Sequence, residues 1–276
     1  MTKKAKKKPT GDMTTAKIAG EAAKTVAPGV PSESGAANNR PFVAIEALDV
    51  FFGDYQALIN INLTLNRGDR TALLGPNGAG KSTLIKAVCG ALNPSGGRVL
   101  VDGKDPRLAK ADPALLGWLP EGAPLNPELT VLEHLRLTCR LRNLNEAEGR
   151  REMERLIEGL NLANKLNRLA GGLSMGSRRQ AALALALLGQ PKLIVLDEPT
   201  SSLDPAEARR FAELLTTLGP DTTMIISSHI LGEVSGVTEA AIFLNQGSLA
   251  GQGRWENLPG GSDAPHEAYF ELVRHE

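Results

Sequence analysis

The octapeptide GPNGAGKS at residues 75–82 restricts the folds open to this chain, because it functions only between particular flanking elements. It has the spacing G-x-x-x-x-G-K-[ST] of a phosphate-binding P-loop. The apolar residues 71–74 before it have the pattern of a buried strand, and residues 83–88 after it have that of a helix. A strand, a glycine-rich loop and a helix in this order form the context that the motif requires. The alternative, a chance match in a glycine-rich chain, leaves these flanking elements unexplained.

The residue types of this loop suit a polyphosphate accompanied by a divalent cation. Glycines allow the backbone to approach closely, and its N–H groups hold the anion together with the positive end of the helix. Lys81 is expected to reach the β- and γ-phosphates, and the Ser82 hydroxyl to ligate Mg²⁺. The predicted contact residues are Gly75, Pro76, Asn77, Gly78, Ala79, Gly80, Lys81, Ser82 and Thr83. The loop therefore predicts a site for a nucleoside triphosphate, with Mg²⁺ as the metal.

A second motif supplies carboxylates at the end of another apolar run. Residues 193–196 are apolar, and Asp197, Glu198 and Pro199 follow them. Such a run is typical of a central parallel strand buried on both faces. Asp197 is expected to hold Mg²⁺ directly or through water, and Glu198 to activate the attacking water as general base. Alone, these residues could be a strand that ends in a turn; paired with the P-loop, they favour a hydrolytic site.

Three further segments have a recognisable order along the chain. They are LSMGS at residues 173–177, TSSLDP at 200–205 and MIISSH at 224–229. With the P-loop and the Asp–Glu pair, they resemble the motif series of ATP-binding cassette (ABC) proteins over about residues 41–250. The resemblance implies an α/β fold: a P-loop NTPase with a RecA-like core, an antiparallel β subdomain and an α-helical subdomain inserted at about residues 122–190.

The resemblance also implies a site shared between two chains. In the family, two cassettes pack head to tail, and each ATP lies between the P-loop of one and the signature segment of the other, to which LSMGS at residues 173–177 of this chain is similar. Ser174, Gly176 and the start of the following helix are then expected to meet the γ-phosphate, which is anion binding at a helix N-terminus. Asp204, in the segment similar to the D-loop, is assigned to the same ATP site.

Two other site residues follow from the family pattern. Phe52 is expected to stack on the adenine, with Tyr55 as the alternative; a Phe52 ring packed in the sheet is a further possibility. His229, similar to the switch histidine, is expected to contact the γ-phosphate and hold the attacking water. Glu198, His229 and Lys81 are thus the predicted catalytic residues.

The chain departs from the family pattern at a few positions. Glu121 stands where the family's coupling loop, the segment that follows the strand expected at residues 115–119, usually has Gln. We expect its carboxylate to ligate Mg²⁺ or to order water around the ion. The alternative is a loop carboxylate that faces solvent. Met175 stands where the family signature has the first glycine of its Gly-Gly pair, and Ser177 stands where it has Gln. Because Ser174 and Gly176 remain, the contacts to the opposite nucleotide are expected to survive.

The sequence around the coupling loop resembles that of one ABC subfamily. GWLPE at residues 117–121 and PELTVLE at 127–133 are similar to exporters with ABC-2-type membrane partners. The resemblance implies an ATP-hydrolysing subunit that powers a separate transmembrane permease and pairs with a second cassette, as a homodimer or a heterodimer. The alternative is a soluble ABC ATPase that acts in cofactor assembly or translation without a membrane partner.

Composition agrees with a protein of this class. The formal net charge of the 276 residues is zero, so no global attraction to nucleic acid is expected. Apolar runs such as residues 181–188 are far shorter than the ~20 residues that cross a bilayer. The resemblance implies a cytoplasmic protein, peripheral on the inner face of the cell membrane. Cys89 and Cys139 have no metal-site or redox spacing, which favours two reduced thiols.

The first 40 residues differ from the rest of the chain. Residues 1–40 hold eight Lys or Arg against three Asp or Glu and almost no large apolar side chains. This composition predicts a disordered basic extension, either solvated or attracted to anionic lipid. The ATP-binding domain is predicted over residues 41–276, opening with strands at 43–50 and 61–65.

Helix starts can be placed from capping residues. Thr130 and Asn145 are each followed three residues later by Glu, the pattern of a capping box. Ser174 is expected to cap a helix that is apolar nearly all round and therefore buried. Asp204, before Pro205, is expected to cap another.

Overall fold

The computed structural model describes residues 40–108, 112, 114–228, 231–261 and 265–273. Apart from Arg40, the predicted disordered extension therefore lies outside the described residues.

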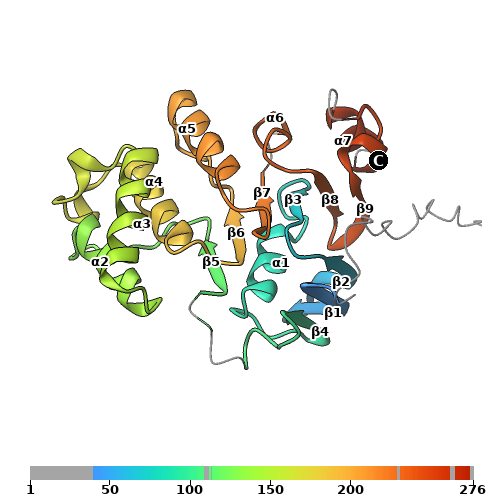
Figure 1. Ribbon diagram of the computed structural model, residues 1–276. Helices are drawn as coiled ribbons and strands as arrows, with labels where there is room; N and C mark the ends of the chain where they lie inside the picture. The colour runs from blue at the N-terminus through green and yellow to red at the C-terminus, as the bar shows by residue number, and fades with distance from the viewer. Residues whose placement is uncertain (1–39, 109–111, 113, 229–230, 262–264, 274–276) are drawn as a thin grey trace, which may run out of the picture.

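The centre of the molecule is a six-stranded sheet with the strand order β5-β6-β7-β3-β8-β9 (Figure 1). Neighbouring strands are parallel from β5 to β8, and β9 is antiparallel to β8. Because the carboxyl ends of parallel strands meet at one edge, this order brings the ends of β3, β6 and β7 together. The strands are β3 (Arg70–Leu74), β5 (Leu116–Leu119), β6 (Leu193–Asp197), β7 (Thr223–Ser227), β8 (Ala240–Asn245) and β9 (Ser248–Arg254).

The apolar run before Asp197 forms β6, and all five of its residues are buried. Leu193 and Val195 pack into one core with α1 and the smaller sheet. Ile194 and Leu196 pack into the other core, with the signature helix α4 (Met175–Leu187) and α5 (Pro205–Thr216). The alternation of β6 between two cores explains why its sequence is continuously apolar, as predicted.

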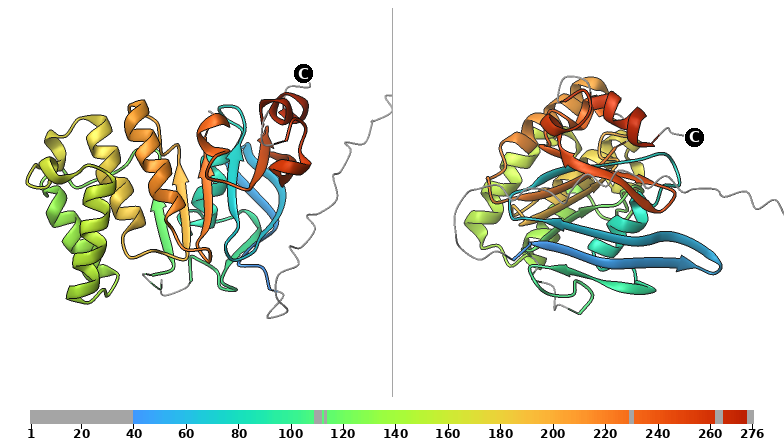
Figure 2. Two further views of the ribbon diagram at one scale, coloured as in Figure 1. Left: turned by 45° about the horizontal axis from the view of Figure 1, so that its top comes forward. Right: turned by 90° about the vertical axis from the view of Figure 1, so that its right-hand side faces the viewer.

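A second, three-stranded antiparallel sheet has the order β2-β1-β4. Its strands are β1 (Val43–Phe52), β2 (Tyr55–Leu65) and β4 (Gly96–Val101). In the right-hand view of Figure 2 it forms a separate layer below the central strands. Helix α1 (Lys81–Val88) packs between this layer and β6.

Both strands of the β1–β2 hairpin are longer than predicted. The register shifts between Ile45 and Leu48 and again between Leu48 and Val50, and Ala47 (φ 46°) and Asn60 (φ 45°) adopt left-handed backbone conformations. Such bulges interrupt the alternation of inward and outward side chains. The period-2 pattern therefore understates the length of these strands.

The helices form two groups. Helices α2, α3 and α4 lie together at the left of Figure 1, and α5, α6 and α7 lie along its top. None of the helices in the described part of the chain is long and apolar enough to cross a membrane. The bounds are α2 (Val131–Leu141), α3 (Glu146–Gly159), α4 (Met175–Leu187), α5 (Pro205–Thr216), α6 (Leu231–Val234) and α7 (Pro265–Val273).

The predicted helix caps are confirmed. Thr130, Asn145 and Asp204 each form a capping box with the Glu three residues on. The Ser174 hydroxyl accepts from the N–H of Ser177 and begins α4. Most residues of α4 are buried, which agrees with its apolar sequence.

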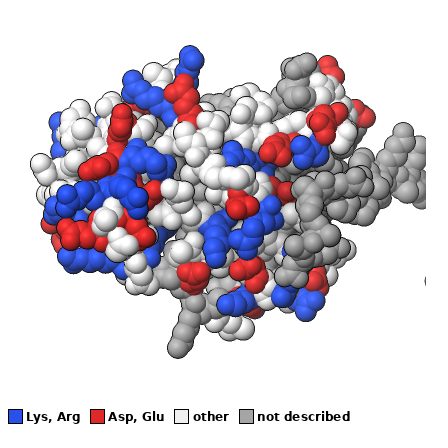
Figure 3. Space-filling model, viewed as in Figure 1, with Lys and Arg blue, Asp and Glu red and all other residues white. Residues whose placement is uncertain are grey.

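Charges of both signs are interspersed over α2–α4 in Figure 3. The ion pair Arg150–Glu146 on α3 is 3.3 Å long, and both side chains are largely exposed. Exposed pairs of this kind contribute about 0–1 kcal/mol each to stability. The fold therefore depends on the two apolar cores rather than on surface ion pairs.

Candidate functional site

A cavity of about 390 Å³ lies at the carboxyl edge of the central sheet. Most of the predicted site residues contribute to its wall, although they come from four separate parts of the chain. The lining residues are Phe52, Tyr55, Ala57, Asn77, Gly78, Ala79, Gly80, Lys81, Ser82, Thr83, Glu121, Asp197 and Glu198. The cavity thus joins the phosphate loop, the two carboxylates, the coupling-loop Glu and the hairpin aromatics.

The phosphate loop leads from β3 into α1, as its sequence requires. Gly75 has φ 154°, and a Cβ atom there would lie 2.3 Å from the carbonyl oxygen of Leu244. Gly80 has φ 103°, and a Cβ atom there would lie 2.8 Å from the carbonyl oxygen of Ala57. Both positions need glycine, because any larger residue would force the loop away from its neighbours.

Lys81 is the first residue of α1, and its side chain is buried inside the loop. Its Nζ donates to the carbonyl oxygens of Gly75 at 2.7 Å and Pro76 at 3.1 Å. Burial lowers the pKa of the ammonium, while the nearby carboxylates, Glu198 foremost, act in the opposite direction. A buried cation beside a helix N-terminus is suited to a polyanion.

The Asp197 carboxylate and the backbone of Glu198 are held by Ser227, a residue that the sequence did not single out. Ser227, the last residue of β7, donates from Oγ to Oδ1 of Asp197 at 2.6 Å. The same Oγ accepts from the backbone N–H of Glu198 at 2.9 Å. Ser227 is fully buried and stands opposite Asp197 in the register of the two strands. A polar residue that ends an apolar strand, next to a strand ending in Asp, was the signal available.

Glu198 itself adopts an unusual backbone conformation, with φ 49°. A left-handed conformation is uncommon for a residue other than glycine and is often found at functional sites. The Ser227 hydroxyl accepts from the N–H of Glu198, and the side chain of Glu198 lines the cavity. The conformation therefore places a carboxylate where a nucleophilic water could lie beside the phosphate loop.

Phe52 and Tyr55 stand on either side of the tight turn of the β1–β2 hairpin and both line the cavity. Phe52 is 50% exposed and Tyr55 60% exposed. Phe52 is therefore not a core ring of the sheet. Each aromatic face is open to a planar base, so both remain candidates for adenine stacking.

The signature segment does not line this cavity. Ser174 and the 74%-exposed Met175 begin α4 at the surface, beside the segment at 200–205. Ser202 Oγ lies 3.0 Å from the sulfur of Met175, and a Cβ atom on Gly176 would be 2.7 Å from the Ser202 carbonyl. Ser174 is thus exposed, whereas Gly176 is half-buried against Ser202.

Two further residues predicted for the ATP site are Asp204 and His229. The Asp204 carboxylate accepts from the N–H of Glu207 at 2.8 Å and caps α5, outside the cavity lining. The predicted switch residue His229 lies outside the described residues. The nucleotide roles of both stay predictions.

Comparison with known proteins places the fold and the motifs in one family. Residues 58–201 match the family described as ABC transporter. "ABC transporter ATP-binding protein NatA" of Bacillus subtilis (strain 168) is 34% identical over 206 residues, which are 74% of this chain and 84% of NatA. The "Uncharacterized ABC transporter ATP-binding protein YxlF" of the same organism is 29% identical over 216 residues, 78% of this chain and 72% of YxlF.

A solved structure described as "Structure of ATP binding subunit of ABC transporter" superposes with a TM-score of 0.77 at 28% sequence identity. The match covers 84% of this chain and 99% of the other. The α/β fold predicted from the motifs is therefore confirmed. With a family match over half of its residues and these relatives, the chain belongs to the ABC transporter family.

Proposed function

We propose that this chain is the ATP-binding and hydrolysing subunit of an exporter and drives a separate transmembrane permease. The observation that carries the proposal is that the phosphate loop, Lys81, Asp197 and Glu198 line the same cavity. A triphosphate held by the loop would lie beside the carboxylates that end β6. Relatives named as transporter ATP-binding proteins support the transport role.

Each group then has a role that its position supports. The backbone N–H groups of the loop and Lys81 would bind the β- and γ-phosphates. Mg²⁺ would be held by Ser82, Asp197 and Glu121, which all line the cavity. Glu198 would accept a proton from the attacking water. The aromatic ring of Phe52 or Tyr55 would cover the adenine.

The proposed partner at the γ-phosphate is the signature segment of a second cassette. Ser174 and Gly176 lie outside their own chain's cavity, at the exposed start of α4. We propose that a second copy of this chain can supply this segment in the purified protein. ATP would then join the two copies, and hydrolysis would release them, a motion that can be passed to a permease.

The Ser174→Asp variant tests this arrangement. Aspartate also caps helices well, so α4 is expected to remain folded, but its charge would face the γ-phosphate of the opposite nucleotide. We expect ATP binding by the monomer to stay within about twofold of the parent, while ATP-dependent dimer formation and turnover fall about tenfold or more. Calorimetric titration and light scattering measure the two effects. Loss of ATP binding by the isolated monomer would contradict the arrangement.

Glu121 is proposed to act through Mg²⁺. Glu121→Gln restores the common family residue and is expected to change basal hydrolysis only a few-fold. Glu121→Ala is expected to raise the Mg²⁺ concentration needed for half-maximal turnover by about threefold to tenfold, because it removes one oxygen ligand for a hard cation. A Mg²⁺ titration of turnover decides the point. An alanine variant that titrates like the parent would show that Glu121 is a surface carboxylate.

The membrane partner is tested by gentle solubilisation of membranes that contain the full chain. We expect a hydrophobic permease to co-purify with this chain at a fixed ratio. Such a complex would place the chain on the inner face of the membrane. A purely cytosolic assembly would instead support the soluble alternative, in cofactor assembly or translation.

A further inference from the structure

Arg179 lies in the signature helix α4, and its side chain is buried against three segments of the candidate site. Its guanidinium donates to the carbonyl oxygens of Pro120 and Glu121 in the coupling loop. It also donates to the carbonyl oxygens of Asp197 and Glu198 at the end of β6. A further contact goes to the hydroxyl of Ser201, in the segment between β6 and α5.

These partners show that Arg179 organises backbone rather than forming an ion pair. Among the described residues, its acceptors are four carbonyl oxygens and one hydroxyl, with no carboxylate. Arg179 is only 3% exposed; burial lowers the pKa of its guanidinium, while the nearby carboxylates, Asp197 foremost, act in the opposite direction. A planar fork of five donors suits several carbonyls at fixed angles, which no other side chain can reproduce.

The contact with Glu198 is the most informative of these. Glu198 has φ 49°, and its N–H is held by Ser227 while its carbonyl is held by Arg179. The two contacts come from different elements: the neighbouring strand β7 supplies one and α4 the other. With the N–H and the carbonyl of the residue both held, the direction in which its side chain leaves the backbone is fixed.

The helix that carries Arg179 also carries the signature. Ser174 caps α4, and Arg179 lies five residues further along, a rise of about 7.5 Å in an α-helix. A helix of this length moves as one body when its start is engaged. The same guanidinium also holds the coupling loop, whose Glu121 lines the cavity.

We propose that Arg179 is a positioning residue that couples the two nucleotide sites of a cassette dimer. Engagement of Ser174 by the nucleotide of the second copy shifts α4, and Arg179 passes this shift to Glu198 and Glu121 of its own chain. Each site therefore becomes competent when the opposite nucleotide is bound. The inference rests on the proposed function, because it requires a second cassette at the signature.

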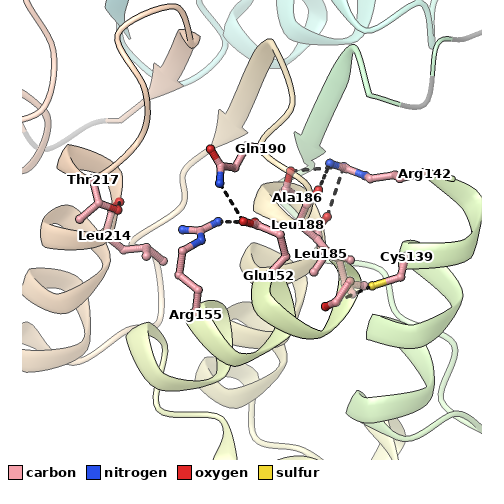
Figure 4. A network of polar contacts seen from close by, with 11 residues as sticks. Cys139, Arg142, Glu152, Arg155, Leu185, Ala186, Leu188, Gln190, Leu214 and Thr217 are labelled. Carbon is pink, nitrogen blue, oxygen red and sulfur yellow. Dashed lines mark hydrogen bonds and ion pairs between the residues drawn. The ribbon is translucent and has the colours of Figure 1, made fainter. Parts of the chain in front are cut away.

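Arg142 offers a matched control at the other end of the same helix (Figure 4). It donates to the carbonyl oxygens of Leu188, Leu185 and Ala186 at the end of α4, and to that of Leu116 in β5. Burial lowers the pKa of its guanidinium to about 10. Arg142, which follows α2, is therefore a buried guanidinium that holds backbone carbonyls at the far end of α4, but none of its acceptors lies in the coupling loop or at Glu198.

The experiment compares Arg179→Gln, Arg179→Lys and Arg142→Gln in the full chain. Turnover is measured against ATP concentration, and ATP binding to the monomer is measured separately. For Arg179→Gln we expect unchanged monomer binding, a maximal rate lower by roughly 10- to 100-fold, and a Hill coefficient that falls toward one. Arg179→Lys is expected to keep the charge but not the fork, so its Hill coefficient also falls. Arg142→Gln is expected to lower the melting temperature while the Hill coefficient stays at the parent value.

Retained cooperativity in the Arg179 variants would overturn the proposal, and so would an equal loss of cooperativity in Arg142→Gln. If Arg179→Gln does not fold, Arg179→Lys decides alone by the same criterion. A parent chain that hydrolyses ATP without cooperativity would overturn the coupling and leave the ATPase assignment intact. A parent chain that does not hydrolyse ATP would remove the proposed function itself.

Discussion

Replacing Lys81 by alanine is expected to abolish measurable ATP binding and turnover. The Lys81 ammonium is buried inside the phosphate loop, where it now donates to the carbonyls of Gly75 and Pro76. In the nucleotide complex it would face the terminal phosphates, whose charge no other side chain of the loop neutralises. Calorimetric titration with Mg-ATP and a phosphate-release assay measure the two losses.

Lys86→Ala is the matched control for this variant. Lys86 is exposed on the last turn of the same helix and does not line the cavity. Its removal is expected to leave affinity and turnover within about twofold of the parent, because charges exposed to water interact weakly over such distances. A folded Lys81→Ala variant with the turnover of the parent would rule out the assignment of this loop.

Glu198→Gln is expected to bind Mg-ATP and to stop before hydrolysis, as a closed dimer. The amide keeps the size of the side chain but no longer accepts a proton from water. We expect turnover to fall by about 10²- to 10⁴-fold, the range of a general base. Light scattering with and without Mg-ATP detects the dimer, and a phosphate-release assay gives the rate.

Glu158→Gln, on the exposed face of α3, removes the same charge away from the cavity. This control is expected to behave as the parent in both assays. Near-normal hydrolysis by Glu198→Gln would show that the base lies elsewhere. Loss of nucleotide binding in that variant would show that Glu198 has a structural role at the end of β6.

The parts of the fold that follow short-range rules were predictable from the sequence. A continuous apolar run indicated that β6 is buried on both faces, and Thr130, Asn145 and Asp204 began helices through capping boxes. The lengths of β1 and β2 were not predictable from alternation, because bulges with left-handed residues such as Ala47 shift the inward face partway along the strand.

Within the site, the residues on the cavity wall were largely identified from motifs, whereas those behind the wall were not. Ser227 acts by lying opposite Asp197, which depends on which strands pair. In the sequence, Arg179 is simply one of two adjacent basic residues near the start of a predicted helix. Its neighbour Arg178 is only partly buried, and Arg179 is almost fully buried. Only the packing of α4 against the three segments that Arg179 contacts distinguishes them.

The site shared between two copies is tested most directly by mixing Lys81→Ala with Ser174→Asp. Each variant alone is expected to be nearly inactive, one for lack of a phosphate-binding lysine and the other for lack of a functional signature. In a mixed dimer, the loop of the Ser174→Asp chain meets the intact signature of the Lys81→Ala chain. One complete ATP site is thereby assembled, so the account predicts that mixing restores ATP-dependent dimer formation, measured by light scattering, well above that of either variant alone. A mixture that forms no more ATP-dependent dimer than the separate variants would contradict it.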